Sequence, residues 1–132
     1  MITDEYLEKD ASFRRLETEY KKYGSLTIGV DFDSTLHDYH KTGKSYEQVR
    51  QLVRDLKKIG CIIIIWTAYK DHDYVEQFLK ENDIPFHGIN TDGIKLPWYS
   101  RKPFFNALID DRAGMIQVYN DLKKLVKKVT NE

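Results

Sequence analysis

The 132-residue sequence has no long apolar run and contains only one cysteine and three prolines. No stretch approaches the roughly 20 apolar residues that cross a membrane. The acidic start, MITDEYLEKD, lacks the apolar core of a secretory signal. A single cysteine, Cys61, excludes an internal disulfide framework and a multi-cysteine zinc site. These absences predict a cytoplasmic protein with no membrane partner.

An excess of charge of either sign is also missing. Lys and Arg total 21, as do Asp and Glu, so the formal net charge is zero. This balance does not favour strong non-specific binding to nucleic acid. A hydrophobic fraction of 41% excludes a disordered chain. The length suits one domain, which we expect to span 1–132.

Hydrophobic periodicity predicts strands that alternate with helices. Short apolar runs predict three strands, with a weaker fourth: 26–31, 61–66 and 106–110, then 86–89. Amphipathic patterns predict four helices: 3–23, 45–59, 73–81 and 113–129. The segment 85–103 holds all three prolines and is predicted to be a loop. Together these elements predict an α/β fold, a three-layer Rossmann-like sandwich with a parallel sheet.

The helices carry further expectations. Ser45 to Gln48 fits a capping box at the start of one helix. The last helix is expected to bury one apolar face that includes Met115 and Ile116. The first helix, within 1–24, is expected to pack on the domain's own surface, and a role in a homodimer is the alternative.

Polar residues follow three of the predicted strands. The first strand ends at Asp31, and Asp33 comes two residues later; Thr67 and Ala68 follow the second strand; the last strand ends at Asp110, and Asp111 comes next. In a parallel α/β sheet the carboxyl ends of the strands form the ligand site, so we expect these residues to meet. Lys102 stands just before the last strand. The pattern therefore predicts one polar site assembled from distant parts of the chain.

The residue types indicate the chemistry of that site. Several carboxylates at one sheet edge repel one another unless a cation lies among them, and oxygen ligands favour Mg²⁺. A divalent cation, a lysine and a threonine hydroxyl suit a phosphoryl group. An Asp carboxylate can attack phosphorus to form an aspartyl-phosphate. A second Asp, two positions later, can protonate the leaving oxygen.

The sequence resembles the haloacid dehalogenase (HAD) superfamily of phosphatases. DFDST is similar to the first motif, WTA to the second, SRKP to the third and IDDR to the fourth. The resemblance implies Asp31 as nucleophile and Asp33 as acid/base, with Asp31, Asp33, Asp110 and Asp111 as the metal site. Asp33 would bind the metal through its backbone carbonyl. It implies Thr67, Ala68 and Lys102 as phosphate-binding residues. Asp33 favours phosphate over halide chemistry, because the dehalogenase members lack an acid there.

The resemblance also implies what surrounds the site. The segment 36–44 is long enough only for a flap and 85–103 only for an extended loop, so the enzyme is expected to be capless with an open site. The IDDR ending is similar to deoxyribonucleotidases and to small HAD proteins of phages and bacteria. Nucleotides or nucleic-acid end phosphates are therefore expected substrates.

Other interpretations remain for the protein and for single residues. A receiver domain is excluded, because its phosphorylated Asp ends a central strand and Thr67 stands at that position here. A catalytically silent HAD-like interaction module is the second hypothesis.

His37 and His40 lie in the flap, where solvated histidines are commoner than ligands. Trp98 and Tyr99 suit either base stacking or a hydrophobic lid, and Arg112 suits either substrate contact or an ion pair.

Overall fold

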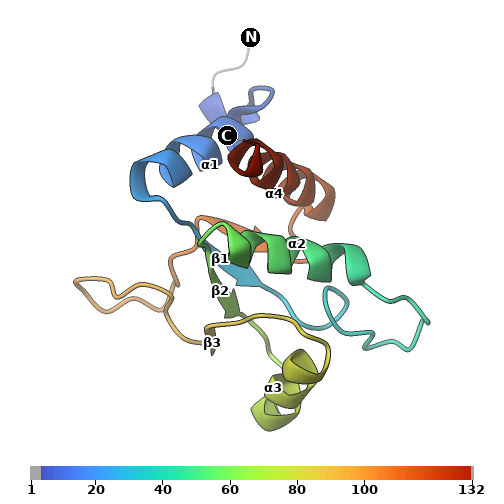
Figure 1. Ribbon diagram of the computed structural model, residues 1–132. Coiled ribbons are helices and arrows are strands. Elements are labelled where there is room, and N and C mark those ends of the chain that lie inside the picture. Colours follow the sequence, from blue (N-terminus) through green and yellow to red (C-terminus); the bar gives the residue numbers. More distant parts are fainter. Residues whose placement is uncertain (1–3, 132) are drawn as a thin grey trace.

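The computed structural model describes residues 4–131 (Figure 1). Four α-helices, four strands and a short 3-10 helix follow one another in the order η1 Glu5–Leu7, α1 Ala11–Tyr23, β1 Thr27–Val30, α2 Glu47–Lys58, β2 Ile62–Ile65, α3 His72–Glu81, β3 Gly88–Ile89, β4 Ala107–Ile109 and α4 Met115–Thr130. The alternation of strands and helices expected from the sequence is confirmed. Thr3, where the first helix was expected to begin, lies outside the described residues.

The four strands form one parallel sheet in the order β3-β2-β1-β4. The chain moves outward from β1 through α2 to β2 and through α3 to β3, then returns along 90–106 to place β4 on the other side of β1. The direction of winding thus changes between β1 and β4. In α/β sheets this change opens a crevice at the carboxyl ends of the two strands, where ligands bind.

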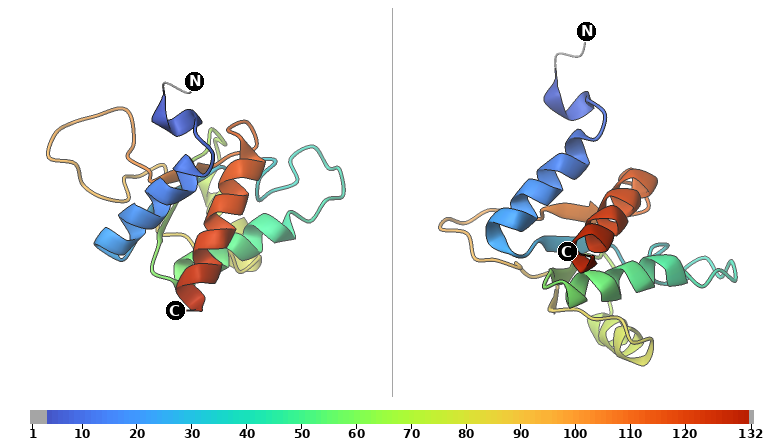
Figure 2. Two further views of the ribbon diagram at one scale, coloured as in Figure 1. Left: turned by 90° about the horizontal axis from the view of Figure 1, so that it is seen from above. Right: turned by 45° about the horizontal axis from the view of Figure 1, so that its top comes forward.

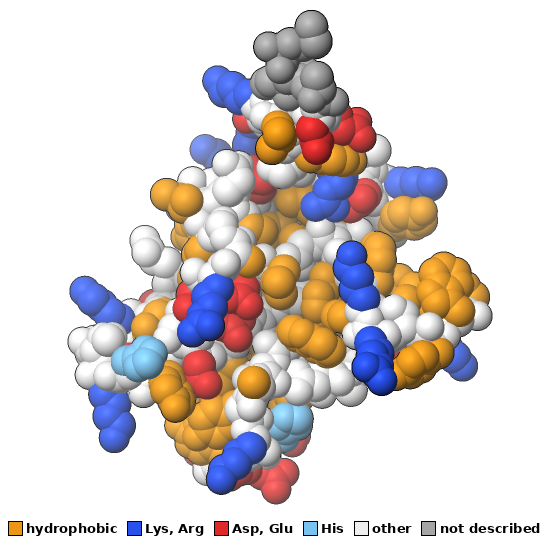
Figure 3. Space-filling model, turned by 180° about the vertical axis from the view of Figure 1, so that it is seen from behind, with side chains coloured by type: hydrophobic (Ala, Val, Ile, Leu, Met, Phe, Trp, Pro, Cys, Tyr) orange, Lys and Arg blue, Asp and Glu red, His pale blue; other side chains and the backbone are white. Residues whose placement is uncertain are grey.

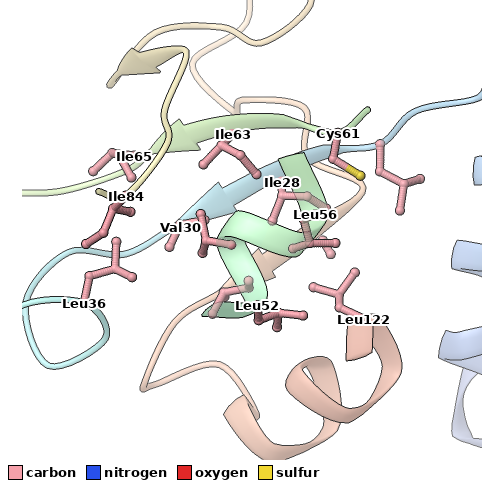
Figure 4. Packing of buried hydrophobic residues seen from close by; sticks show 14 of the residues in the cluster. Ile28, Val30, Leu36, Leu52, Leu56, Cys61, Ile63, Ile65, Ile84 and Leu122 are labelled. Carbon is pink, nitrogen blue, oxygen red and sulfur yellow. The ribbon is translucent and has the colours of Figure 1, made fainter. Parts of the chain in front are cut away.

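One face of the sheet is covered by helices. Strand side chains alternate between the faces, and the register aligns Val30 with Ile65 and Ile109 on this side. Apolar residues from all four α-helices belong to the same buried cluster. Figure 4 shows Leu52 and Leu56 of α2 and Leu122 of α4 close to the strands. The α/β fold class expected from the sequence is confirmed.

The other face is covered by the extended segment 90–106 instead of a helix. A Cβ on Gly29 would lie 2.6 Å from the Phe105 ring, and a Cβ on Gly93 would lie 2.4 Å from Thr27. Glycine therefore allows this segment to approach the strands closely. The third layer is a single stretch of chain, visible in orange at the side of the sheet in Figure 2.

Three expectations about the helices are wrong. The first helical pattern is interrupted, because Asp10 takes a left-handed conformation with φ +63° that separates η1 from α1. The capping box at Ser45 is not formed, since Tyr46 with φ +55° is the N-cap and makes no side-chain cap bond. Ile116, in the first turn of α4, is 77% exposed, so it does not belong to the buried face of this helix. The buried residues of α4 are Asp121, Leu122 and Leu125.

No helix within residues 4–131 is long and apolar enough to cross a membrane.

The contact between Gly29 and Phe105 can be tested by replacement. Gly29→Ala places a methyl group inside the Phe105 ring, and overpacking of this kind costs about 1–3 kcal/mol. We expect a fall in Tm of about 3–10 °C in thermal unfolding. The double variant Gly29→Ala/Phe105→Leu should recover part of the loss. An unchanged Tm in the single variant would contradict the close approach of segment 90–106.

Candidate functional site

A pocket of about 390 Å³ lies at the carboxyl ends of β1, β2 and β4, and we call it the acidic pocket. Backbone hydrogen bonds bring the strand ends together. The Asp31 amide donates to the Ile109 carbonyl over 2.8 Å, and the Trp66 amide donates to Val30 over 2.8 Å. The lining residues are Asp31, Asp33, Ser34, Tyr39, His40, Thr67, Ala68, Asp110, Asp111 and Arg112. Six of the seven site residues named from the sequence are among them.

Three carboxylates converge in the acidic pocket. Asp31, Asp110 and Asp111 each offer an oxygen, and these oxygens lie within 4.8 Å of one another. Such a donor set, made only of oxygen, fits a hard divalent cation such as Mg²⁺. Asp33 is outside this cluster. Its predicted contact with the metal is through the backbone carbonyl, which this cluster of side-chain oxygens does not test.

The Thr35 hydroxyl links the two strand ends at this point. It donates to Asp31 Oδ2 over 3.1 Å and accepts from the Asp111 amide over 3.2 Å. Thr35 is fully buried, so its hydroxyl needs both partners. Thr35 belongs to the DFDST segment, but nothing in the sequence pattern predicts this role for it. Thr35 fixes the Asp31 carboxylate relative to the loop that carries Asp111.

The Asp31 carboxyl is unusually difficult to ionise without a cation. Burial raises its pKa to about 7, and the neighbouring Asp111 and Asp110 carboxyls add to the rise. The hydrogen bond from Thr35 acts in the opposite direction and offsets only part of it. At neutral pH the protein groups around Asp31 therefore do not fully compensate the negative charge of its ionised carboxylate.

Asp33 forms a hydrogen bond with His37, a residue that the sequence led us to expect in contact with solvent. His37 Nδ1 lies 2.8 Å from Asp33 Oδ1, and His37 Nε2 lies 3.0 Å from the Tyr74 hydroxyl. The His37 ring stacks on Phe32 with centroids 4.7 Å apart. Its side chain is only 15% exposed. The Asp33 side chain is 29% exposed and lines the acidic pocket.

The turn between Asp33 and His37 explains how this pair forms. Ser34 takes a left-handed conformation with φ +61°, which costs a serine more than a glycine. The Ser34 amide donates to the His37 carbonyl over 2.8 Å. The tight turn brings a histidine four residues away back over the carboxylate. No helical or strand periodicity in the sequence signals this contact.

The loop after β2 is fixed by Asn90. The Thr67 amide donates to Asn90 Oδ1 over 2.8 Å, and Asn90 Nδ2 donates to the Thr67 carbonyl over 2.7 Å. The Thr67 hydroxyl accepts from the Tyr69 amide over 3.0 Å. These bonds place Thr67 and Ala68 on the wall of the acidic pocket. Asn90 was not identified from the sequence, because it follows only a two-residue strand.

Lys102 is the site residue that the structure does not bring to the pocket. It is exposed on segment 90–106, where its amide donates to Ser100 Oγ over 3.1 Å. Arg112 lies at the acidic pocket instead, and its guanidinium forms no ion pair among the described residues.

Trp98 and Tyr99 are 66% and 87% exposed, so the hydrophobic lid considered from the sequence is not formed. In Figure 3 basic side chains lie beside acidic ones on one face of the molecule.

The raised pKa of Asp31 predicts how stability depends on pH in the metal-free protein. Between about pH 4 and pH 7 the folded state keeps a proton that the unfolded state releases, so the free energy of unfolding falls as pH rises. Asp31→Asn removes this effect. After allowance for partial exposure, we expect a gain of about 1–2 kcal/mol at pH 8, or roughly 3–8 °C in Tm with a chelator present.

The matched control for that measurement is Asp92→Asn, which changes an exposed aspartate outside the acidic pocket. Its Tm should follow that of the unaltered protein at every pH. Loss of stability in Asp31→Asn at pH 8 would contradict the electrostatic description of the site.

Comparison with known proteins supports the fold alone. No family model matches the chain, and no curated protein matches it. A conserved protein from Bacteroides thetaiotaomicron has a similar solved structure, with a TM-score of 0.62 and 24% sequence identity over 80% of this chain and 92% of that one. A target protein from Vibrio cholerae gives a TM-score of 0.46 at 21% identity over 79% of this chain and 98% of that one. The chain shares an α/β architecture with the first of these structures.

Proposed function

We propose that this protein is a Mg²⁺-dependent phosphomonoester hydrolase that acts through an aspartyl-phosphate on Asp31. The observation that carries the proposal is the convergence of Asp31, Asp110 and Asp111 in one pocket that Asp33 and Thr67 also line. A cluster of carboxylates that disfavours its own ionisation is suited to a cation and to an anionic substrate. Nucleotides or nucleic-acid end phosphates are the substrates that the sequence resemblance implies.

The chemistry follows from the roles of the side chains. An Asp31 carboxylate oxygen attacks phosphorus, and the bond from phosphorus to the leaving oxygen breaks as Asp33 gives that oxygen a proton. Asp33 then accepts a proton from the water that hydrolyses the aspartyl-phosphate. Bound Mg²⁺, held by Asp31, Asp110 and Asp111, would favour the ionised carboxylates and offset charge on the phosphoryl oxygens.

Phosphate binding falls to groups on the wall of the pocket. Thr67 and Ala68 line the acidic pocket from the loop after β2, and we assign them to the phosphate. Arg112 adds a cation at the pocket. Lys102 would have to move with segment 90–106 to reach the phosphate, so its role stays a prediction.

The first test measures release of phosphate from 4-nitrophenyl phosphate with and without Mg²⁺. We expect turnover that requires Mg²⁺ and falls about a thousandfold or more in Asp31→Asn, because the attacking carboxylate is lost. Asp92→Asn is the control. A folded protein that binds Mg²⁺ but hydrolyses none of a panel of nucleoside monophosphates, sugar phosphates and 3′-phosphorylated oligonucleotides would favour the silent interaction module. Equal, weak rates across the panel would remove nucleotides as the substrate class.

The contact between His37 and Asp33 predicts a dependence on the leaving group. His37→Leu removes the hydrogen bond that orients Asp33, so protonation of the leaving oxygen should slow. We expect kcat for an alkyl phosphate to fall about 10-fold or more with little change in KM. Turnover of 4-nitrophenyl phosphate should fall less, since 4-nitrophenolate leaves without a proton.

Two variants complete this experiment. His37→Asn keeps a donor near the position of Nδ1 and should restore part of the loss. His72→Leu changes an exposed histidine at the start of α3 that does not line the acidic pocket, and should behave as the unaltered protein. An equal loss on both substrates in His37→Leu would show that His37 acts on the fold and not through Asp33.

A further inference from the structure

A second cavity adjoins the acidic pocket and shares part of its wall. It has a volume of about 640 Å³ and is lined by Asp33, Tyr39, Ala68, Tyr69, Lys70 and Asp71. Asp33, Tyr39 and Ala68 line both cavities. The two cavities therefore adjoin at these three residues. We call the second cavity the tyrosine pocket.

One aromatic wall of the tyrosine pocket is fixed. The Tyr69 ring stacks on Tyr74 with centroids 5.4 Å apart and 25° between the planes, and its edge meets Phe32 at 5.8 Å. The Tyr69 amide is held by Thr67. Five rings pack together here at centroid distances of 4.7 to 6.2 Å: Phe32, His37, Tyr69, Tyr74 and Phe78. A ring held on several sides is prepared to bind another ring without an ordering cost of its own.

The other aromatic wall comes from the flap. Tyr39 is 54% exposed, and its ring meets only His40, at 5.1 Å, among the ring contacts of the described residues. The flap itself is ordered, because Asp38 accepts hydrogen bonds from the amides of Thr42 and Gly43, each over 2.8 Å. An exposed tyrosine on an ordered turn beside a cavity provides apolar surface that the fold does not use.

The position of Asp33 relates this pocket to the proposed reaction. A carboxylate that protonates the leaving oxygen must lie between the phosphoryl group and the rest of the leaving group. The phosphoryl group belongs on the side of Asp31 and Thr67, in the acidic pocket. The leaving group then extends past Asp33 into the tyrosine pocket, toward Tyr69.

We propose that the tyrosine pocket is the subsite for the leaving group, and that it takes a planar aromatic ring against Tyr39 and Tyr69. The proposal rests on the proposed phosphatase function. Lys70, which forms no ion pair among the described residues, adds positive charge at the rim. The substrate class is a phosphomonoester of an aromatic alcohol or of an alcohol that carries an aromatic ring near the ester.

The test compares two probes that differ in the ring. Phenyl phosphate and cyclohexyl phosphate carry the same phosphoryl group, but only the first is planar and aromatic. Binding of each to Asp31→Asn in the presence of Mg²⁺ is followed by NMR titration, so that turnover does not enter. We expect phenyl phosphate to bind at least about threefold more tightly, because aromatic pairs prefer one another beyond their buried area.

Tyr39 decides whether the preference comes from this pocket. In the Asp31→Asn background, Tyr39→Leu should reduce the ratio of the two affinities to about one, while Tyr39→Phe should keep it. Tyr39 is exposed, so both variants are expected to fold, which their Tm will check. The affinity ratio within each variant is independent of any general change in phosphate binding.

The outcomes separate this proposal from the proposed function. A preference for phenyl phosphate that depends on the ring at position 39 supports the subsite, even if the unaltered protein releases no phosphate and the phosphatase proposal fails. Equal affinities, a preference unchanged in Tyr39→Leu, or binding of neither probe would overturn the subsite. If Mg²⁺-dependent turnover is observed together with any of these three results, the phosphatase proposal is supported and the subsite proposal is wrong.

Discussion

The pairing of β1 with β4 sets the geometry on which the candidate site depends. Because these strands are parallel neighbours, the Asp31 amide donates to the Ile109 carbonyl, and the residues that follow each strand emerge side by side. The Thr35 hydroxyl completes the connection by contacting Asp31 and the Asp111 amide. A shift of one residue in this register would turn the Asp31 side chain to the other face. The acidic pocket is thus a consequence of strand pairing.

The site combines two carboxylates in different surroundings. Asp31 is crowded by Asp110 and Asp111, and its pKa is raised. Asp33, two residues later, shares a hydrogen bond with His37, whose ring stacks on Phe32. Placing one carboxylate among like charges and the other beside a hydrogen-bonding histidine is a common means of giving two acids different roles. The alternation of an extended chain after β1 provides this separation.

How much of the fold and of the candidate site the sequence predicts depends on the kind of interaction. Interactions that repeat along the chain are predictable, and single contacts set by turns and loops are not. The strands and helices follow from local periodicity, and the strand-end rule brings Asp31, Thr67 and Asp111 together over 80 residues of chain. His37 escaped prediction because its role depends on a left-handed turn at Ser34, where serine gives no local signal. Asn90 and Thr35 act through single hydrogen bonds that have no periodicity. Lys102 was placed by its resemblance to a motif, whereas its position depends on the path of a long loop.

The covering of the second sheet face has a consequence for how far Lys102 can travel. Phe105 packs over Gly29 of β1, and Asp31 follows the last residue of this strand, Val30. Lys102 is three residues from Phe105, so their Cα atoms can never be more than about 11 Å apart while that ring stays in place. The short stretch 102–105 is therefore anchored at Phe105, next to the strand that leads to Asp31. While Phe105 stays over Gly29, this anchor limits the distance that Lys102 can travel.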